Sequence, residues 1–329
     1  MELKAGVGCA RGLTRGFGGE KLEATPELLQ GSKSYKGLDA REEKTLRKLS
    51  AIVFGIAALA VLAVAAVTLS GRGSGGIETL KKKEETEASA APAVARRAVV
   101  VELFTSEGCS SCPPADALLA RLDQTQPVEG AEILPLALHV DYWNQLGWAD
   151  PFSSHEFSVR QGEYAAAFGN DGVYTPQMVV DGVKEFNGSN ASLAQEAIGK
   201  AAREPKGEVT LTHAASQSGE AVRITAQIEK FPKPTEGETV NVLLALTESG
   251  LASDVARGEN SGRKLTHIGV VRSLKSLGGL PEAPGTSFKA ETEVLIEKGW
   301  RRENLRAVVF AQERGTRRVL AAGSVKLFD

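Results

Sequence analysis

The 329-residue chain has few cysteines, few aromatic residues and almost no net charge. Its three cysteines are too few for a disulfide-rich mini-protein and too few for an all-cysteine zinc site. The 39 Lys and Arg residues nearly balance the 41 Asp and Glu residues, which gives a net charge of -2. Because a protein that neutralises phosphates needs a basic excess, we expect no nucleic-acid partner. The composition leaves a globular protein of roughly one to three domains.

Residues 51–69 (AIVFGIAALAVLAVAAVTL) form an apolar run without a charge. As a helix rising about 1.5 Å per residue, this run matches a hydrocarbon core of about 30 Å, and it lacks the polar stripe of a soluble helix. We therefore predict a transmembrane or signal-anchor helix. Four basic residues precede the run closely and one follows, which by the positive-inside rule predicts a cytoplasmic amino terminus: Arg41, Lys44, Arg47 and Lys48 before it and Arg72 after it.

The segments on either side of this run are polar or of low complexity. Residues 1–50 are glycine-rich with mixed charge and predict a disordered cytoplasmic tail, while residues 70–96 predict a flexible linker. The expected location is the bacterial inner membrane, with a single span and with the later domains in the periplasm. If the chain start is over-extended, the apolar run is instead a cleaved signal and the protein is secreted.

A pair of cysteines follows the first strongly apolar strand. Residues 98–104 (AVVVELF) predict a strand buried on both faces, and residues 109–114 (CSSCPP) then lead into a helical stretch. Free N–H groups and the helix dipole favour an anion at the start of a helix, so we expect a low pKa and a nucleophilic thiolate at Cys109. Cys112, one turn later, is the expected resolving thiol. No cysteine follows Cys112, so the second pair of a zinc site is absent.

The elements expected after this helix continue in the order of a thioredoxin fold, β-α-β-α-β-β-α. They are a strand at 133–140, a helix at 155–168, strands at 177–180 and 183–186 joined by an Asp-Gly turn, and a helix at 191–203. In a thioredoxin fold a cis-proline starts the antiparallel strand that faces the dithiol. Residues 97–205 are therefore predicted to be an α/β thioredoxin-like domain.

The hydrophobic period changes after residue 206. Apolar residues alternate with polar ones, as expected for half-buried antiparallel strands. Seven strands are predicted, at 208–213, 222–228, 240–246, 265–273, 288–296, 304–312 and 318–326. Their spacing predicts an all-β sandwich-like domain at 206–329. The predicted fold class is thus a thioredoxin-like domain followed by a β-sandwich-like domain, with an amino-terminal transmembrane helix.

Four blocks of the sequence resemble the DUF1223 family of secreted proteins with a thioredoxin-like domain. The blocks are VELFTSEGCSSCPPAD at 101–116, HVDYWNQLG at 139–147, YTPQMVVDG at 174–182 and GENSGRKLTH at 258–267. The resemblance covers about residues 97–329 and implies a dithiol site without naming a substrate. It also implies that Thr175 and Pro176 form a cis peptide beside Cys109, where the Thr175 backbone would pair with a bound peptide.

Several other residues are candidates for the site. A buried carboxylate at Glu102 would have a raised pKa and could deprotonate Cys112, although a solvent-facing carboxylate fits the strand equally well. Tyr142 and Trp143 would form a substrate groove or lid, or would simply pack. The glycine-rich charged loop at 256–263 does not open a helix, so it fails as a phosphate loop, and we expect it to pack against the dithiol domain or shape its groove.

Three functions remain open at this point. The leading one is a membrane-tethered extracytoplasmic thiol-disulfide oxidoreductase, with Pro176 keeping metal off the dithiol and orienting the partner. Its partners would be extracytoplasmic protein thiols and disulfides or a redox partner protein, and no cofactor is expected because no nicotinamide or flavin motif is present. The alternatives are a copper- or other soft-metal-binding protein using Cys109, Cys112 and His139, and a non-enzymatic binding module with a structural disulfide.

Overall fold

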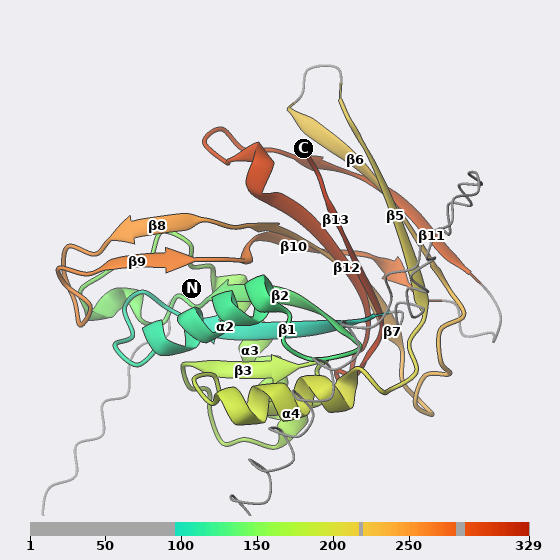
Figure 1. The fold of residues 1–329 in the computed structure, drawn as a ribbon, viewed down its shortest axis with the longest axis horizontal. Helices are drawn as coiled ribbons and strands as arrows, with labels where there is room; N and C mark the ends of the chain where they lie inside the picture. Colours follow the sequence, from blue (N-terminus) through green and yellow to red (C-terminus); the bar gives the residue numbers. More distant parts are fainter. Residues whose placement is uncertain (1–95, 217–219, 281–286, 329) are drawn as a thin grey trace, which may run out of the picture. The chain divides into compact units, whose positions relative to one another are not determined.

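A large mixed β-sheet organises the residues that the computed structural model describes, which are 96–216, 220–280 and 287–328 (Figure 1). The sheet has eight strands in the order β13-β12-β7-β10-β2-β1-β3-β4. The elements of the first half are β1 (Arg97–Thr105), α2 (Pro113–Thr125), β2 (Ala131–His139), the short 3-10 helix η1 (Asn144–Leu146), α3 (His155–Phe168), β3 (Gln177–Val180), β4 (Lys184–Asn187) and α4 (Ala191–Ala201).

The elements of the second half are almost all strands. They are β5 (Glu208–Ala215), β6 (Ala221–Glu229), β7 (Val240–Glu248), β8 (Leu251–Asp254), β9 (Lys264–His267), β10 (Val270–Gly279), β11 (Phe288–Leu295), η2 (Arg302–Asn304), β12 (Leu305–Glu313) and β13 (Val319–Lys326). Strands β5, β6 and β11 form a three-stranded sheet, and β8 and β9 form a separate hairpin.

The central strand β1 is buried on both faces, which explains its continuous apolar sequence. Val99, Val101 and Leu103 pack in a core with α2 and α4, whereas Val100 and Phe104 pack in another core with α3. Strand β2 lies parallel to β1 across the α2 connection, and β3 lies antiparallel on the other side. Helices on both faces allow such a strand to lack the polar-apolar alternation of a half-exposed one.

The predicted order of elements in the first half is confirmed, but the predicted fold class is wrong. Strand β10 pairs in parallel with β2 at Val270 and Ala137, so the later strands β7, β12 and β13 extend the sheet that β1–β4 begin. Residues after 206 therefore do not build a sandwich of their own beside a separate thioredoxin-like sheet. The period-two pattern locates strands, but it does not tell which strand each one pairs with.

A glycine makes the junction between the two halves of the sheet possible. Gly269 has a φ of +59° and separates β9 from β10, which the sequence predicted as one strand. Its carbonyl accepts the N–H of Ala137 at 2.8 Å, and a Cβ at this position would come within 2.8 Å of the Pro135 carbonyl oxygen. Only glycine fits this close approach and positive φ without strain.

No helix among the described residues is long and apolar enough to cross a membrane. The predicted span at 51–69, the predicted tail at 1–50 and the linker as far as residue 95 lie outside the described residues.

Candidate functional site

The loop between β1 and α2 carries the two thiols. Cys112 caps the amino end of α2, and its carbonyl accepts the N–H of Ala115 at 2.8 Å and of Asp116 at 3.1 Å. Cys109 lies one turn earlier and accepts the N–H of Cys112 on its carbonyl at 3.2 Å. Both cysteines are free thiols with 0% of their surface exposed. The strand, loop and helix thus hold the pair as the sequence predicts.

Cys109 is the thiol that ionises first. A hydrogen bond from the Cys112 thiol lowers the pKa of Cys109 to about 6, burial opposes this effect, and the Ser111 hydroxyl, 3.2 Å from Sγ, assists it. Burial raises the pKa of Cys112, and the adjacent Cys109 raises it further. At neutral pH the pair therefore holds a thiolate at Cys109 and a thiol at Cys112.

This asymmetry predicts the pH dependence of labelling. We expect iodoacetamide to alkylate Cys109 of the reduced protein with a midpoint near pH 6, because the thiolate is the reacting species. Cys112→Ala removes the hydrogen bond that lowers the pKa most, so the midpoint should move toward the ordinary cysteine value of about 8.5. Mass spectrometry of the Cys109 peptide across a pH series measures both midpoints. An unmoved midpoint in Cys112→Ala would show that the helix terminus, and not the second thiol, sets this pKa.

The peptide bond between Thr175 and Pro176 is cis, as the family resemblance implies. This cis peptide bond directly precedes β3. Because β3 pairs antiparallel with β1, the bond lies beside the dithiol loop that follows β1. The Thr175 carbonyl oxygen lies 3.9 Å from Sγ of Cys109 and 3.5 Å from Oγ of Ser111. The indole N–H of Trp143 donates to the Thr175 hydroxyl at 2.9 Å. Thr175, Pro176 and Trp143 are therefore gathered at the dithiol.

Tyr142 and Trp143, the two aromatic residues predicted to line the substrate groove, have different surroundings. Trp143 borders the dithiol loop so closely that a Cβ on Gly108 would lie 3.1 Å from the Trp143 Cβ. The hydroxyl of Tyr142 donates to Oε1 of Gln161 on α3 at 3.1 Å. Burial raises the pKa of Tyr142 to about 12, so its phenol stays neutral. Trp143 is thus part of the dithiol wall, and Tyr142 joins that wall to α3.

The structure does not bring Glu102 to the dithiol. Its carboxylate is buried on the α3 face of β1, where Nε and Nη2 of Arg160 donate to Oε1 at 3.0 and 2.5 Å. The same guanidinium donates to Oε1 of Gln312 at 3.0 Å, and Gln312 donates to the Tyr164 hydroxyl at 2.8 Å. Alternation along the strand explains the placement, because Glu102 faces away from Val101 and Leu103, which pack beneath α2.

A carboxyl group that the sequence analysis did not single out lies one helical turn beyond Cys112. Asp116 is partly buried and accepts the Thr105 hydroxyl at 2.9 Å. Desolvation raises the pKa of Asp116, although His267 and His139 oppose this rise. Residues four apart on a helix share a face, so the spacing from Cys112 to Asp116 is the sequence signal that identifies this group.

Two buried acid–histidine pairs contact the dithiol loop through Glu107. Nε2 of His267 lies 3.0 Å from Oε1 of Glu107, and Nδ1 of His139 lies 2.7 Å from Oδ2 of Asp150. The two imidazole rings meet edge to face at 4.8 Å, and Asp150 also accepts the Glu107 N–H at 2.8 Å. The remaining ring nitrogen of each histidine has no hydrogen-bond partner among the described residues. The pairs fix Glu107, two residues before Cys109.

The alternative metal site gains no support from this arrangement. Within residues 96–216, 220–280 and 287–328, no group of three or more His, Cys, Asp or Glu side chains is arranged to hold a metal ion. His139 is directed at Asp150, and although burial disfavours its charge, that carboxylate and others nearby raise the pKa of His139.

The tip of the β8–β9 hairpin, residues 255–263, contacts the dithiol loop directly. Nδ2 of Asn260 donates to the carbonyls of Glu107 and Cys109 at 2.8 and 2.9 Å. The carboxylate of Glu259 accepts the N–H of Ser110 at 3.0 Å. The loop at 256–263 therefore packs against the dithiol segment, as we expected, and it does so through Asn260 and Glu259, which the sequence analysis did not single out.

A family model described as "Protein of unknown function (DUF1223)" matches residues 100–312, which is more than half of the chain. The chain belongs to the DUF1223 family. The DUF1223 match contains both thiols, the cis-proline, Asp116, both acid–histidine pairs and the hairpin tip. No curated protein matches the chain.

Two solved structures share the fold of this DUF1223 protein. Protein AGR_C_4864 from Agrobacterium tumefaciens is 25% identical, with a TM-score of 0.51 over 71% of this chain and 96% of its own. HBP35 of Porphyromonas gingivalis is 15% identical, with a TM-score of 0.52 over 71% of this chain and 76% of its own. At this identity the second likeness concerns the fold alone.

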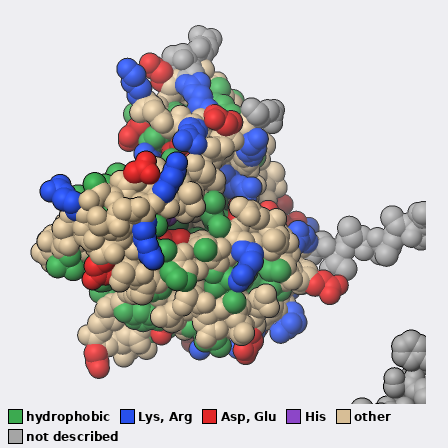
Figure 2. Space-filling view, turned by 60° about the vertical axis from the view of Figure 1, so that its left-hand side comes forward, with side chains coloured by type: hydrophobic (Ala, Val, Ile, Leu, Met, Phe, Trp, Pro, Cys, Tyr) green, Lys and Arg blue, Asp and Glu red, His purple; other side chains and the backbone are tan. Residues whose placement is uncertain are grey.

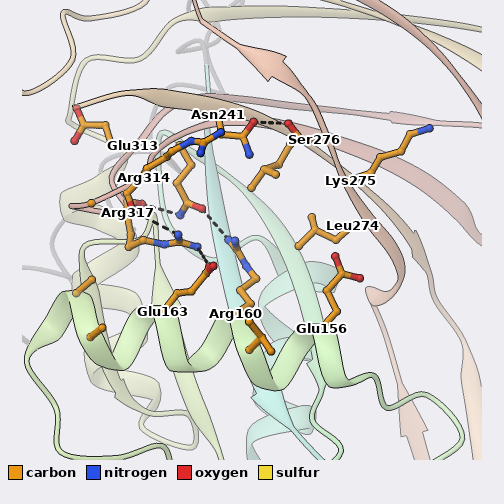
Figure 3. A pocket seen from close by; sticks show the side chains of 16 residues that line it. Glu156, Arg160, Glu163, Asn241, Leu274, Lys275, Ser276, Glu313, Arg314 and Arg317 are labelled. Carbon is orange, nitrogen blue, oxygen red and sulfur yellow. Dashed lines mark hydrogen bonds and ion pairs between the residues drawn. The ribbon is translucent and has the colours of Figure 1, made fainter. Parts of the chain in front are cut away.

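The DUF1223 chain also has a charged cavity of about 740 Å³ between α3 and strands β7, β10 and β12 (Figure 3). Arg160 reaches from α3 toward the strands, and Glu163 points to Arg317, whose Nη2 lies 2.9 Å from its Oε2. The cavity lies on the face to which Glu102 points and includes no dithiol residue. Besides the pair of Glu163 and Arg317, Arg160 is paired with Glu102 and Glu313 with Arg318, two residues outside the lining.

Proposed function

We propose that this DUF1223 protein is a thiol-disulfide oxidoreductase in which Cys109 attacks and Cys112 resolves. The observation that carries the proposal is the asymmetry of the pair, with the pKa of Cys109 lowered to about 6 and the pKa of Cys112 raised. A nucleophilic thiol needs to be ionised near ambient pH, while a resolving thiol keeps its proton until the second step. A buried structural pair has no need of this difference.

The reductive direction illustrates the chemistry. The Cys109 thiolate attacks one sulfur of a substrate disulfide, a new S–S bond forms, and the other substrate sulfur leaves as a thiolate. Cys112 then loses its proton to the Asp116 carboxylate and attacks Sγ of Cys109, which releases the second substrate thiolate. Two electrons pass to the substrate, and the protein is left with a Cys109–Cys112 disulfide. A dithiol of another protein must reduce that disulfide in each cycle.

Asp116 is the proton acceptor in this scheme because of its position. It follows Cys112 by four residues on the same face, and its carboxylate accepts the hydroxyl of Thr105, a side chain that also lowers the pKa of Cys112 slightly. Its desolvated carboxylate has a raised pKa, which makes it a better base than an ordinary aspartate. Glu102, paired with Arg160 on the other face, has no such path to the dithiol.

The substrate surface is formed by Thr175, Pro176, Trp143 and, at its edge, Tyr142. The Thr175 carbonyl beside Cys109 offers the main-chain acceptor with which an extended polypeptide would pair, and Trp143 positions Thr175 through its hydroxyl. The uncharged segment 51–69 supports a site of action outside the cytoplasm, on protein thiols and disulfides that occur there.

The reduction potential of the Cys109–Cys112 pair tests the proposal. We expect a value in the range of about -270 to -120 mV that catalytic dithiols occupy, and the value assigns the direction of transfer. Cys112→Ser should trap mixed disulfides with substrates, whereas Cys109→Ser should form none. A potential below about -300 mV with an unreactive Cys109 would identify a structural disulfide and overturn the proposal.

A further inference from the structure

The tip of the β8–β9 hairpin is anchored by very few side chains. Of residues 255–263 only Val255 and Asn260 are buried, and the others are exposed. Gly258 and Gly262 flank Asn260 at a φ of +78° each, and between these two glycines only the asparagine is buried. The amide oxygen of Asn260 accepts from Nη1 of Arg263 at 2.9 Å, which holds it within the tip.

Asn260 and Glu259 of the tip bind backbone atoms at Cys109 and the residue after it. Asn260 bonds the carbonyl of Cys109 itself, and Glu259 occupies the N–H of Ser110, the next residue. The Thr175 carbonyl lies 3.9 Å from Sγ of Cys109, and Trp143 packs against the neighbouring Gly108. Cys109 itself is 0% exposed, although its pKa makes it a thiolate at neutral pH. A substrate disulfide cannot approach Sγ without moving one of these covers.

The hairpin tip is the cover that can move at least cost. Trp143 and Thr175 belong to segments held in the main cores or paired with the sheet, whereas β8 and β9 pair only with each other among the described strands. Local opening free energies are lowest where few apolar groups are buried and the backbone is exposed. Figure 2 brings this end of the molecule forward and shows acidic, basic and hydrophobic side chains interspersed on it.

We infer that Asn260 and Glu259 are specificity-determining residues, which keep small disulfides from Cys109 and yield to a polypeptide. The inference rests on the proposed function. An extended polypeptide segment can displace the tip by replacing its bonds, because a main-chain carbonyl can accept the Ser110 N–H that Glu259 now occupies. A small disulfide such as glutathione disulfide has little surface with which to offset the loss of the Asn260 bonds.

Labelling by iodoacetamide tests the cover without any turnover. In the reduced full chain, well above pH 6, Asn260→Ala should raise the rate at Cys109 about tenfold, the factor expected when one or two hydrogen bonds no longer oppose opening. The midpoint of the pH profile should stay in place. Ser261→Ala removes a hydrogen bond within the tip, from Oγ to the Ala256 carbonyl at 3.1 Å, but none of the tip's hydrogen bonds to the dithiol loop, so this matched control should leave the rate unchanged. Peptide mass spectrometry separates Cys109 from Cys9 and Cys112.

Rates with two disulfides test the selectivity. Asn260→Ala and Glu259→Ala, which removes the acceptor of the Ser110 N–H, should accelerate reaction with glutathione disulfide about tenfold and change reaction with an unfolded disulfide-bonded polypeptide by less than about threefold. Three results would overturn the inference. The variants could accelerate reaction with both disulfides equally, or Cys109 of the wild type could be labelled as fast as a free thiolate. The third result is an unchanged labelling rate in Asn260→Ala. Failure of the proposed function is distinguishable, because it would leave the labelling result intact while neither disulfide reacts.

Discussion

Replacing Arg160 by methionine is expected to lower the free energy of unfolding by about 3–5 kcal/mol, because the Glu102 carboxylate then stays buried without its cation. Both partners are nearly inaccessible, with side chains 6% and 2% exposed. The substitution also removes the donor to Gln312 and the contact of the guanidinium with the Tyr164 ring, 5.2 Å away. Urea unfolding of the full chain measures the loss.

Two further variants separate the charge effect from lost packing. Arg223→Met breaks an ion pair with Glu291 whose side chains are 61% and 58% exposed, and it should cost less than about 1 kcal/mol. Glu102→Met combined with Arg160→Met should recover most of the stability, since an apolar pair of similar volume often replaces a buried ion pair without loss. A single Arg160→Met variant as stable as the wild type would contradict this prediction.

Asp116→Asn is expected to slow the second step of disulfide exchange about 100-fold while leaving the attack by Cys109 nearly unchanged. Asparagine keeps the shape of the side chain but cannot take the Cys112 proton, so the mixed disulfide between Cys109 and its substrate should accumulate. In the wild type the rate of this step should rise with pH as Asp116 ionises, at a pH above its usual range. Rapid acid quenching followed by mass spectrometry measures the mixed disulfide.

Matched substitutions show whether the proton is the cause. Asp123→Asn, on the same helix, should leave the second step unchanged, and Thr105→Val should slow it by a smaller factor because it removes the bridging hydroxyl.

Asp116→Asn should not lose stability at neutral pH. A carboxyl whose pKa is raised on folding stabilises the protein only below its unfolded pKa, and that contribution disappears as the pH rises through the raised value. Equal second-step rates in wild type and Asp116→Asn would remove Asp116 from the scheme.

The sequence could predict the local elements of this protein but not how its sheet continues. An uninterrupted apolar strand, a C-x-x-C at a helix start and an Asp-Gly turn each depend on neighbouring residues, and the order of elements they predict is confirmed. Strand β10 pairs with β2 in register at Val270 and Ala137, which lie far apart in the chain. Nothing in the alternation of either strand specifies that partner, so two domains were expected where one sheet forms.

The site shows the same division between local and distant signals. Cys109, Cys112 and Pro176 could be assigned from their spacing and family resemblance, and strand parity could have placed Glu102 on the wrong face for the dithiol. Asp116 was also within reach of a local rule, since it follows Cys112 by four residues on a helix. No local rule could identify His267 and Asn260, because their contacts with the dithiol loop span 160 and about 150 positions of the chain.

That separation has a consequence for the newly made protein. A ribosome completes Cys109 and Cys112 long before it reaches Asn260 and His267, which close over and support them. At about 5–20 residues per second, the nascent dithiol spends several seconds or more without its cover. During this interval the thiols are open to small oxidants and to other nascent chains. The emerging chain therefore needs a reducing environment or a chaperone more than the finished protein does, and its yield should depend on the redox conditions during synthesis.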